Sequence, residues 1–378
     1  AGTDTVRIDN SGGAVTAVLD MDDISGLENV TVYDANGAAT TAEAVSITFT
    51  AVSEGDIQTI VVDGSVITDA DDDLTVNASA VAVATTTFTI TGGAGDDILT
   101  GGDGADTITG GSGADTINGD GGNDILTGGA GNDIFSTTTA LLTGLDTVSG
   151  GSGTDVLSVT DASTIVDDDF TSVTSVETLT LADAAHTVTL GSNATSAGIV
   201  TVNGGTDVDT ITLGALYTNN VTIAAGTGAD IITATNYTGT LTLTGGAGVD
   251  TLNMGSGTTT FTGGAAADIV NVMASGNLGS ADTITGGTAT DVINLSAAMT
   301  VVDADFTNVT TVETLTAGNV AVNITLGAEA KEAGIVTITL GNATNTVNAS
   351  AYTSTVLTIT GGTGADTIQG GTGNDILS

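Results

Sequence analysis

The sequence predicts an all-β protein built of parallel β-roll or β-solenoid modules, with very little helix. Three observations predict this fold. Five nine-residue repeats follow one another without a gap, a long segment recurs at a constant offset, and Thr-rich runs alternate polar and apolar residues. The composition agrees, because 55 of the 378 residues are glycine and only 3% are aromatic. A core of large aromatic side chains is therefore not expected.

The tandem repeats occupy residues 92–136 and read GGAGDDILT, GGDGADTIT, GGSGADTIN, GDGGNDILT and GGAGNDIFS. Glycine fills positions one and four, an acid fills position six, and an apolar residue fills position eight. The position-six aspartates are Asp97, Asp106, Asp115, Asp124 and Asp133. The unit recurs further along the chain, where its aspartates include Asp155, Asp209, Asp230, Asp250, Asp366 and Asp375.

The nonamer has a direct physical reading. Glycine adopts backbone angles closed to other residues, so six residues turn tightly and the last three form a strand whose apolar middle residue points inward. Two nonamers make one coil, and successive coils stack at about 4.8 Å, the spacing of neighbouring strands. This predicts Asp97, Asp115 and Asp133 along one edge and Asp106 and Asp124 along the other. Runs such as TGTLTLT (238–244) are predicted to be further short strands.

A larger repeat divides the chain. The segment that begins GGSGTDVLS at 150 and contains VETL matches the segment that begins GGTATDVIN at 286, an offset of 136 residues (286 minus 150) that holds to Gly198 and Gly334. We predict a β-rich module with a VETL-like cassette at 1–91, the tandem roll at 92–136, a second solenoid module at 137–285, and a third at 286–378 that duplicates the 150–242 region. A short helical turn is expected only at 328–334 and before each VETL.

The stacked turns create a problem of charge. Two carboxylates about 4.8 Å apart repel each other by roughly 3.5 kcal/mol at an effective dielectric constant near 20. The chain holds only two basic residues that could relieve this, Arg7 and Lys331. A divalent cation would relieve it, because turn carbonyls and paired carboxylates supply six or so oxygens at flexible distances, which suits Ca²⁺ better than Mg²⁺. The alternative is a metal-free turn whose acids are solvated.

Tandem GGxGxDxUx repeats resemble the RTX (repeats-in-toxin) family, whose repeats form a calcium-binding parallel β-roll. The resemblance implies Ca²⁺ between turns two repeats apart, held by the position-six aspartates and by turn carbonyls. The implied carbonyl ligands are those of Gly93, Gly95, Gly102, Gly104, Gly111, Gly113, Gly129 and Gly131. Three copies depart from the pattern: Asp120 replaces a glycine, and the copies at 263 and 286 lack the third glycine. The resemblance also implies type I secretion.

Composition narrows the partners. The 45 acidic and two basic residues give a formal charge of −43, which repels nucleic acid and anionic membrane surfaces. No cysteine is present, and no run of eighteen apolar residues predicts membrane insertion. The sequence begins and ends within repeat-like units, so we expect a segment of a longer chain.

No catalytic constellation is predicted, and the chain is not expected to be an enzyme. The one histidine, His186, is predicted to lie on a surface strand, and neither a GxSxG nor a GxxxxGK motif occurs. The clusters Asp167–Asp169 and Asp303/Asp305 could be paired acids for glycoside hydrolysis, but a solvated or calcium-linked turn is favoured because aromatic residues are scarce. Glu28, Glu177 and Glu313 are predicted to bind backbone amides or an additional calcium.

Repetition without catalytic residues favours a calcium-dependent structural protein of the cell surface. RTX-type surface-layer proteins of Gram-negative bacteria are similar in composition and repeat style, which implies assembly with copies of itself into a surface layer (S-layer) or extracellular filament. Cell-surface polysaccharide is a further possible partner, through regions outside this segment. The alternatives are a calcium-rigidified adhesin or biofilm-matrix stalk, an ice-binding solenoid with a flat Thr array, and the repeat tail of a protease or lipase.

Overall fold

A computed structural model describes residues 4–9, 15–19, 27–33, 44–50, 59–138, 142, 146–353 and 355–378. The chain forms two compact units. Unit 1 contains residues 1–161, 167–182 and 196–199, and unit 2 contains 162–166, 183–195 and 200–378. The division into segments 1–91, 92–136, 137–285 and 286–378 stays a prediction.

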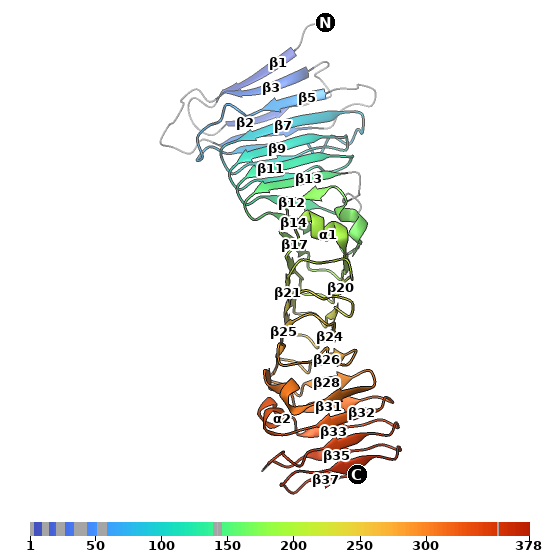
Figure 1. The fold of residues 1–378 in the computed structure, drawn as a ribbon. Helices are drawn as coiled ribbons and strands as arrows, with labels where there is room; N and C mark the ends of the chain where they lie inside the picture. The colour runs from blue at the N-terminus through green and yellow to red at the C-terminus, as the bar shows by residue number, and fades with distance from the viewer. Residues whose placement is uncertain are drawn as a thin grey trace. The chain divides into compact units, whose positions relative to one another are not determined.

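Unit 1 is a parallel β-solenoid with two sheets (Figure 1). The strands of one sheet are β1 (Asp4–Asp9), β3 (Leu27–Tyr33), β5 (Thr59–Asp63), β7 (Thr87–Gly93), β9 (Thr107–Ser112), β11 (Ile125–Ala130), β13 (Thr147–Ser152) and β16 (Val173–Thr174). The strands of the other are β2 (Val15–Leu19), β4 (Val45–Phe49), β6 (Leu74–Asn77), β8 (Ile98–Thr100), β10 (Thr116–Asn118), β12 (Ile134–Thr137), β14 (Val156–Val159) and β17 (Thr178–Leu181). The chain alternates between the sheets, so each coil adds one strand to each.

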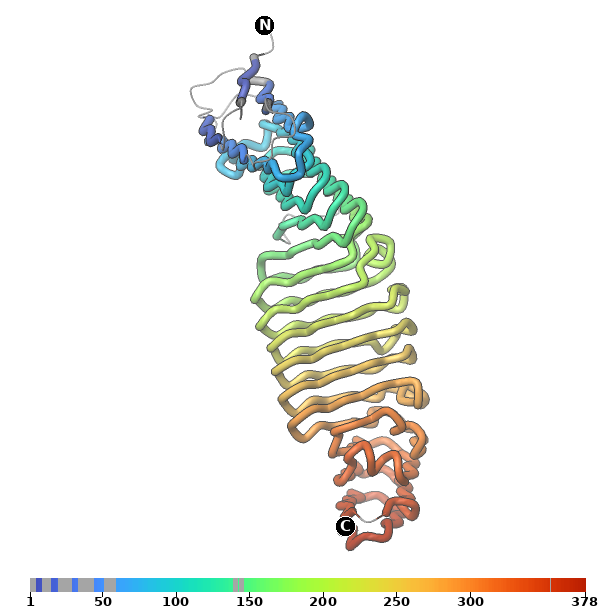
Figure 2. Tube along the Cα trace, turned by 90° about the vertical axis from the view of Figure 1, so that its left-hand side faces the viewer, coloured from blue at the N-terminus to red at the C-terminus, as the bar shows by residue number. Residues whose placement is uncertain are grey.

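Unit 2 continues the same principle with three sheets, and Figure 2 shows its coils following one another along the trace. One sheet holds β19 (Thr201–Asn203), β21 (Val221–Gly226), β23 (Leu241–Gly246), β25 (Thr259–Gly264), β27 (Thr283–Gly287) and β30 (Val309–Thr310). The second holds β15 (Thr164–Ile165), β18 (Thr187–Leu190), β20 (Thr210–Leu213), β22 (Ile231–Thr233), β24 (Thr251–Met254), β26 (Ile269–Val272), β28 (Val292–Leu295), β31 (Thr314–Ala317), β33 (Thr337–Thr339), β35 (Thr358–Thr360) and β37 (Ile376–Leu377). The third holds β29 (Met299–Val301), β32 (Val322–Thr325), β34 (Thr346–Asn348) and β36 (Thr367–Gln369).

The core is the inward column of apolar residues that the nonamer predicts. Leu99, Ile117 and Phe135 are buried, and β8, β10 and β12 pair so that these three residues lie opposite one another in register. Leu126 and Ile108 occupy the matching positions of β11 and β9. Every second residue of a strand faces this core. The all-β parallel solenoid predicted from the sequence is therefore confirmed.

Helix is confined to short segments among the described residues. The two α-helices are α1 (Ser192–Ala197) and α2 (Ala328–Ala333), and two 3₁₀ turns are η1 (Asp167–Phe170) and η2 (Asp303–Phe306). The turn predicted at 328–334 is α2, and η1 and η2 precede the two VETL segments as predicted. None of the helices described could cross a membrane, since all are too short and insufficiently apolar.

The duplicated cassette interrupts the regular coils. In its second copy, η2 places Phe306 in the core, and the carboxylate of Asp303 accepts the backbone N–H groups of Gly327 and Ala330, at 2.6 and 3.0 Å, at the start of α2. Asp303 lies in the 3₁₀ turn η2, as the favoured interpretation expects, and its solvation or link to calcium stays a prediction. Its carboxylate binds the first amide groups of α2, which lack partners within so short a helix.

Candidate metal centre: columns of buried carboxylates

A first column of carboxylates runs along one edge of unit 1. The backbone N–H of Asp97 donates to Oδ1 of Asp115 at 2.9 Å, that of Asp115 to Oδ1 of Asp133 at 2.9 Å, and that of Asp133 to Oδ1 of Asp155 at 2.8 Å. The column ends at Glu177, whose Oε2 accepts the N–H of Asp155 at 2.8 Å. Each turn is thus tied to the next by an acid that is itself withdrawn from water.

A second column runs along the other edge of unit 1. The N–H of Asp106 donates to Oδ1 of Asp124, and that of Asp124 to Oδ1 of Asp146, both at 2.9 Å. The two edges therefore hold the aspartates that the two-nonamer coil assigns to them. Asp146 is a member that sequence reasoning missed, because its unit (141–149) lacks the first two glycines of the repeat and keeps only Gly144 at position four. The Asp-Thr-Val spacing at 146–148 was the available signal.

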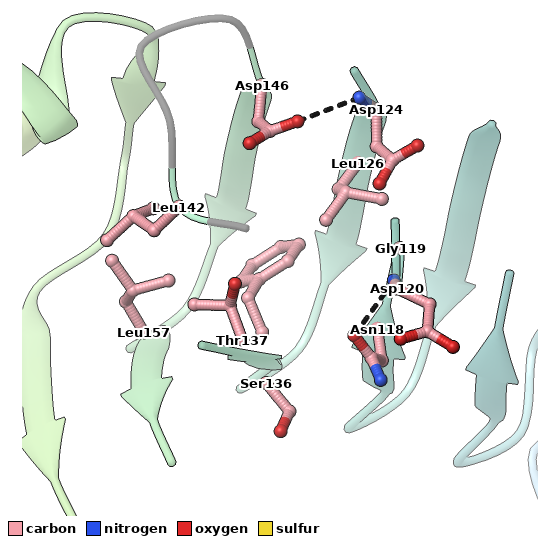
Figure 3. A pocket seen from close by; sticks show the side chains of 11 residues that line it. Asn118, Gly119, Asp120, Asp124, Leu126, Ser136, Thr137, Leu142, Asp146 and Leu157 are labelled. Atoms are coloured by element: carbon pink, nitrogen blue, oxygen red, sulfur yellow. Dashed lines mark hydrogen bonds between the residues drawn. The ribbon is translucent and has the colours of Figure 1, made fainter. Parts of the chain in front are cut away.

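A cavity lies beside the second column (Figure 3). Leu126, Phe135, Leu142 and Leu157 line it together with Asp124 and Asp146, and Figure 3 shows the bond between these two acids. Asp120 also lines it and adopts φ 65°, a left-handed conformation that is uncommon for a residue other than glycine. The substitution at position two of that repeat therefore keeps the turn, at some cost in backbone strain.

The third column belongs to unit 2 and gathers repeats that lie scattered in the sequence. Successive backbone N–H groups donate to Oδ1 of the next acid at 2.7–2.8 Å. Its members, in order, are Asp209, Asp230, Asp250, Asp268 and Asp291. Glu313 ends the column and accepts the N–H of Asp291 at 3.0 Å. Intervals of 18 to 23 residues separate the partners, so each coil has one repeat turn and a second turn of variable length.

Asp268 and Asp291 are further members that sequence reasoning did not select; their repeats lack the third glycine, as does the repeat of Asp209. Both retain the first two glycines, Gly263 and Gly264 or Gly286 and Gly287, and both take their place in register. A Cβ on Gly264 would overlap the carbonyl oxygen of Gly246. In these two repeats the close approach between coils therefore depends on the second glycine, while the fourth position tolerates alanine.

His186 precedes the third column and corrects a prediction. It is only 2% exposed, and both its backbone N–H and its Nδ1 lie against Oδ1 of Asp209, at 2.9 and 3.2 Å. The expected surface strand residue is in fact a buried residue at the place of a repeat aspartate, followed two positions later by the buried Val188. The polar and apolar alternation of the strand could not predict the burial of His186. This residue is buried because it lies in the turn before the strand, against Asp209 of the next coil.

The C-terminal repeats make contacts of the same kind. Oδ1 of Asp366 accepts the N–H of Asn345 at 2.9 Å, and Oδ1 of Asp375 accepts that of Leu357 at 3.0 Å. Asp366 and Asp375 therefore serve different columns, as their nine-residue separation requires. Asp282 makes the same contact with the N–H of Thr259 at 2.8 Å outside any nonamer. The side chain of Glu28 lies outside the described residues.

One oxygen of most column carboxylates has no hydrogen-bond partner although it is buried. This Oδ2 belongs to Asp97, Asp115, Asp133, Asp155, Asp209, Asp230, Asp250, Asp268 and Asp291. A Cβ on Gly92 would overlap both Asp97 Oδ2 and the carbonyl oxygen of Gly110 in the next coil. Two acceptor oxygens thus converge over one glycine, and the same convergence recurs at Gly128, Gly245 and Gly263. Buried oxygens that converge without a donor fit a cation.

The carbonyl groups implied as ligands lie between successive coils. The oxygen of Gly93 lies against Gly111, and that of Gly95 lies against Gly113, where glycine φ values of 128° and 121° permit the approach. The same contact continues from Gly111 to Gly129 and from Gly113 to Gly131, and then from Gly129 to Gly151 and from Gly131 to Gly153. On the other edge, the oxygen of Gly104 lies against Gly122, whereas that of Gly102 accepts the N–H of Gly121 at 3.0 Å.

Burial raises the pKa of ten aspartates in the three columns. It is the largest cause at each residue, neighbouring carboxylates add to it, and hydrogen bonds from backbone amides oppose it. The pKa rises to about 7 for Asp97, Asp106, Asp124 and Asp250, and to about 6 for Asp115, Asp230 and Asp268. For Asp133, Asp155 and Asp291 the pKa is also raised. Without a bound cation, the folded chain therefore disfavours the ionised form of these aspartates.

Comparison with known proteins identifies the repeats. The family model described as the RTX calcium-binding nonapeptide repeat spans four copies of the repeat. It matches residues 89–117, 100–135, 142–159, 242–261 and 358–378. The chain thus carries RTX repeats within a β-solenoid, and this repeat family binds Ca²⁺. No curated protein matches the sequence. Within the described residues no three acidic or histidine side chains gather at one point, so a bound ion would be held by paired carboxylates and main-chain oxygens.

The raised pKa values predict how the calcium-free fold responds to pH. The folded chain binds protons more tightly than the unfolded chain, whose aspartates titrate near 3.8, so its stability falls as the pH rises from about 4 through about 7. We expect calcium-free protein to show a cooperative melting transition near pH 5, and we expect this transition to fall in temperature as the pH rises and to be lost by about pH 8, where the column aspartates ionise. With calcium the trend reverses, since protons then compete with the ion. Calorimetry at each pH measures both; a calcium-free melting temperature that rises with pH would contradict the burial of these acids.

Asp115→Asn tests the column directly. Asparagine keeps an oxygen for the N–H of Asp97 but removes the charge shared with Asp97 and Asp133. We expect about two bound calcium ions to be weakened or lost, and the calcium concentration needed for folding to rise several-fold. Asp375→Asn is the matched control, because Asp375 accepts its inter-coil bond from Leu357 and not from another acid. Calcium titration by calorimetry measures both variants, and equal losses would rule out the column as the binding unit.

Proposed function

We propose that this protein is a calcium-dependent structural protein of the cell surface, which assembles with copies of itself into a surface layer or extracellular filament. The observation that carries the proposal is the arrangement of buried carboxylates in columns along both units. Removal of their repulsion is a condition for the coils to stack. Metal-binding energy is then folding energy. A protein whose acids serve the stacking of its own backbone is a scaffold.

The location follows from the same requirement. Extracellular calcium modules work at affinities of about 10⁻⁴–10⁻³ M, far above the free calcium of a cytoplasm. A chain with formal charge −43 stays expanded without the ion and can fold after export. RTX repeats occur in secreted proteins, and type I secretion is the route that suits a chain folding outside the cell. Self-assembly and contact with cell-surface polysaccharide belong to this proposal.

Chelation and microscopy test the proposal together. We expect protein in calcium to give a β-sheet circular dichroism spectrum and regular sheets or fibres in electron micrographs. EGTA should abolish both the tandem-repeat fold and the assemblies, and restored calcium should bring them back. Isolated rods in calcium would instead favour the adhesin or matrix stalk, and a spectrum that EGTA does not change would refute the calcium role.

One observation favours the minor alternative, an ice-binding solenoid: one sheet of unit 2 carries regular Thr columns. Thr222, Thr242, Thr260 and Thr283 lie opposite one another in successive strands, and Thr244, Thr262, Thr285 and Thr310 form a parallel column two residues along. Most of these side chains are exposed, so they present a flat lattice of hydroxyl and methyl groups. Thermal hysteresis of the calcium-loaded protein would distinguish this function from assembly alone.

A further inference from the structure

The carboxylate columns end at the two cassettes in the same way. At the first cassette, Glu177 accepts the N–H of Asp155, and the N–H groups of Glu177 and Thr178 return to the carbonyl of Asp155 at 3.1 and 3.0 Å. At the second, Glu313 accepts the N–H of Asp291, and the N–H of Thr314 returns to the carbonyl of Asp291 at 3.0 Å. Glutamate therefore stands in each cassette where a repeat turn has its aspartate.

The cassettes also supply a main-chain oxygen where the repeats use glycine. In a regular coil, the carbonyl oxygen of the first glycine of a repeat lies close to the first glycine of the equivalent repeat in the preceding coil. The oxygen of Gly110, for example, lies close to Gly92. At the cassettes this place is taken by the carbonyl of Ser175, which lies against Gly150, and by that of Thr311, which lies against Gly286. Both residues have φ 52°, a left-handed conformation that Ser and Thr rarely adopt. The backbone strain keeps an oxygen at this point.

The aspartate on the repeat side of each junction has a buried oxygen without a partner. Asp155 is 1% exposed and Asp291 is 2% exposed, and Oδ2 of each lacks a hydrogen bond. A Cβ on Gly286 would overlap both Asp291 Oδ2 and the carbonyl oxygen of Thr311, and a Cβ on Gly150 would overlap both Asp155 Oδ2 and the carbonyl oxygen of Ser175. The unpartnered carboxylate oxygen and the cassette carbonyl thus converge, as the equivalent oxygens do inside the columns.

We infer that each cassette closes its carboxylate column with a calcium site of its own, held by Asp155 and Glu177 with the carbonyl of Ser175 in unit 1, and by Asp291 and Glu313 with the carbonyl of Thr311 in unit 2. This inference rests on the proposed calcium-dependent fold. It adds two glutamates that lie outside any nonamer, Glu177 and Glu313, to the calcium ligands. Glutamate reaches one methylene further than aspartate, which suits a turn built without the glycines of the repeat. The site lets a column end on a paired acid at the junction with a segment of different structure.

The test counts bound calcium in the full chain. Glu313→Gln keeps an oxygen that can accept the N–H of Asp291 but removes the charge, and we expect it to bind one calcium ion fewer than the unmodified chain. Glu177→Gln should likewise lose one ion, and the double variant two. Glu332→Gln is the matched control, because this exposed glutamate of α2 lies outside the column. Equilibrium dialysis with metal analysis gives the counts, and circular dichroism in calcium confirms that each variant is folded.

A second variant separates the ligand from the fold. Thr311→Gly relieves the left-handed strain and keeps the carbonyl, although it removes the hydroxyl that accepts the N–H of Gly287, so we expect the full calcium count. Asp291→Asn should lose at least the ion that Glu313→Gln loses. If Glu313→Gln and Glu177→Gln bind as many ions as the unmodified chain, with equal affinity, the cassette sites do not exist, even though EGTA still unfolds the protein. If EGTA leaves the unmodified chain folded, the proposed function itself fails.

Discussion

Repulsion between like charges held at the spacing of a β-ladder is the constraint on which this structure depends. Parallel strands bring equivalent residues of successive coils within about 5 Å, and they do so whether the residues attract or repel. In the first column the consequence is severe, because each acid is buried and its neighbours are acids. The N–H of Asp97 donates to Oδ1 of Asp115, and Oδ2 of Asp115 is left without a hydrogen-bond donor. The same arrangement repeats along the column. The fold and its cation are therefore a single thermodynamic unit.

The rest of each coil is organised around that edge. In unit 2 the edge opposite the third column carries turns of another kind, where Tyr237 donates its hydroxyl to the carbonyls of Asn219 and Thr240 and packs 5.9 Å from the ring of Tyr217. The interval between column members changes from coil to coil, yet their register does not. Length variation is thus absorbed on the edge without column acids, while the carboxylate edge keeps a constant geometry.

The sequence predicts the solenoid, the inward column of Leu99 and Ile117, and the two edges of the tandem block, because all of these follow from local periodicity. It underestimates the columns, since membership is set by stacking and not by the complete motif. Asp268 keeps its place with alanine at the fourth position of its turn, and Asp146 keeps its place although its unit lacks the first two glycines. The burial of His186 was equally hidden, because it depends on the partner turn that carries Asp209. The repeat motif describes the residues of one coil, whereas each carboxylate site is formed by residues of two successive coils.

The cassettes show how a column can end without leaving an isolated buried charge. An acid at the end of a column has no following repeat to share a cation with, and the cost of burying an unpaired carboxylate is several kcal/mol. Ending the column on Glu177 or Glu313 avoids this cost, because the longer side chain reaches back to the last aspartate while Ser175 or Thr311 supplies the oxygen of the missing glycine turn. The strained φ of 52° recurs in both copies at the same place, so it belongs to the design of the junction. The second column ends at Asp146 without a glutamate, so the junction belongs to the first and third columns, and the 136-residue duplication carries one with each copy.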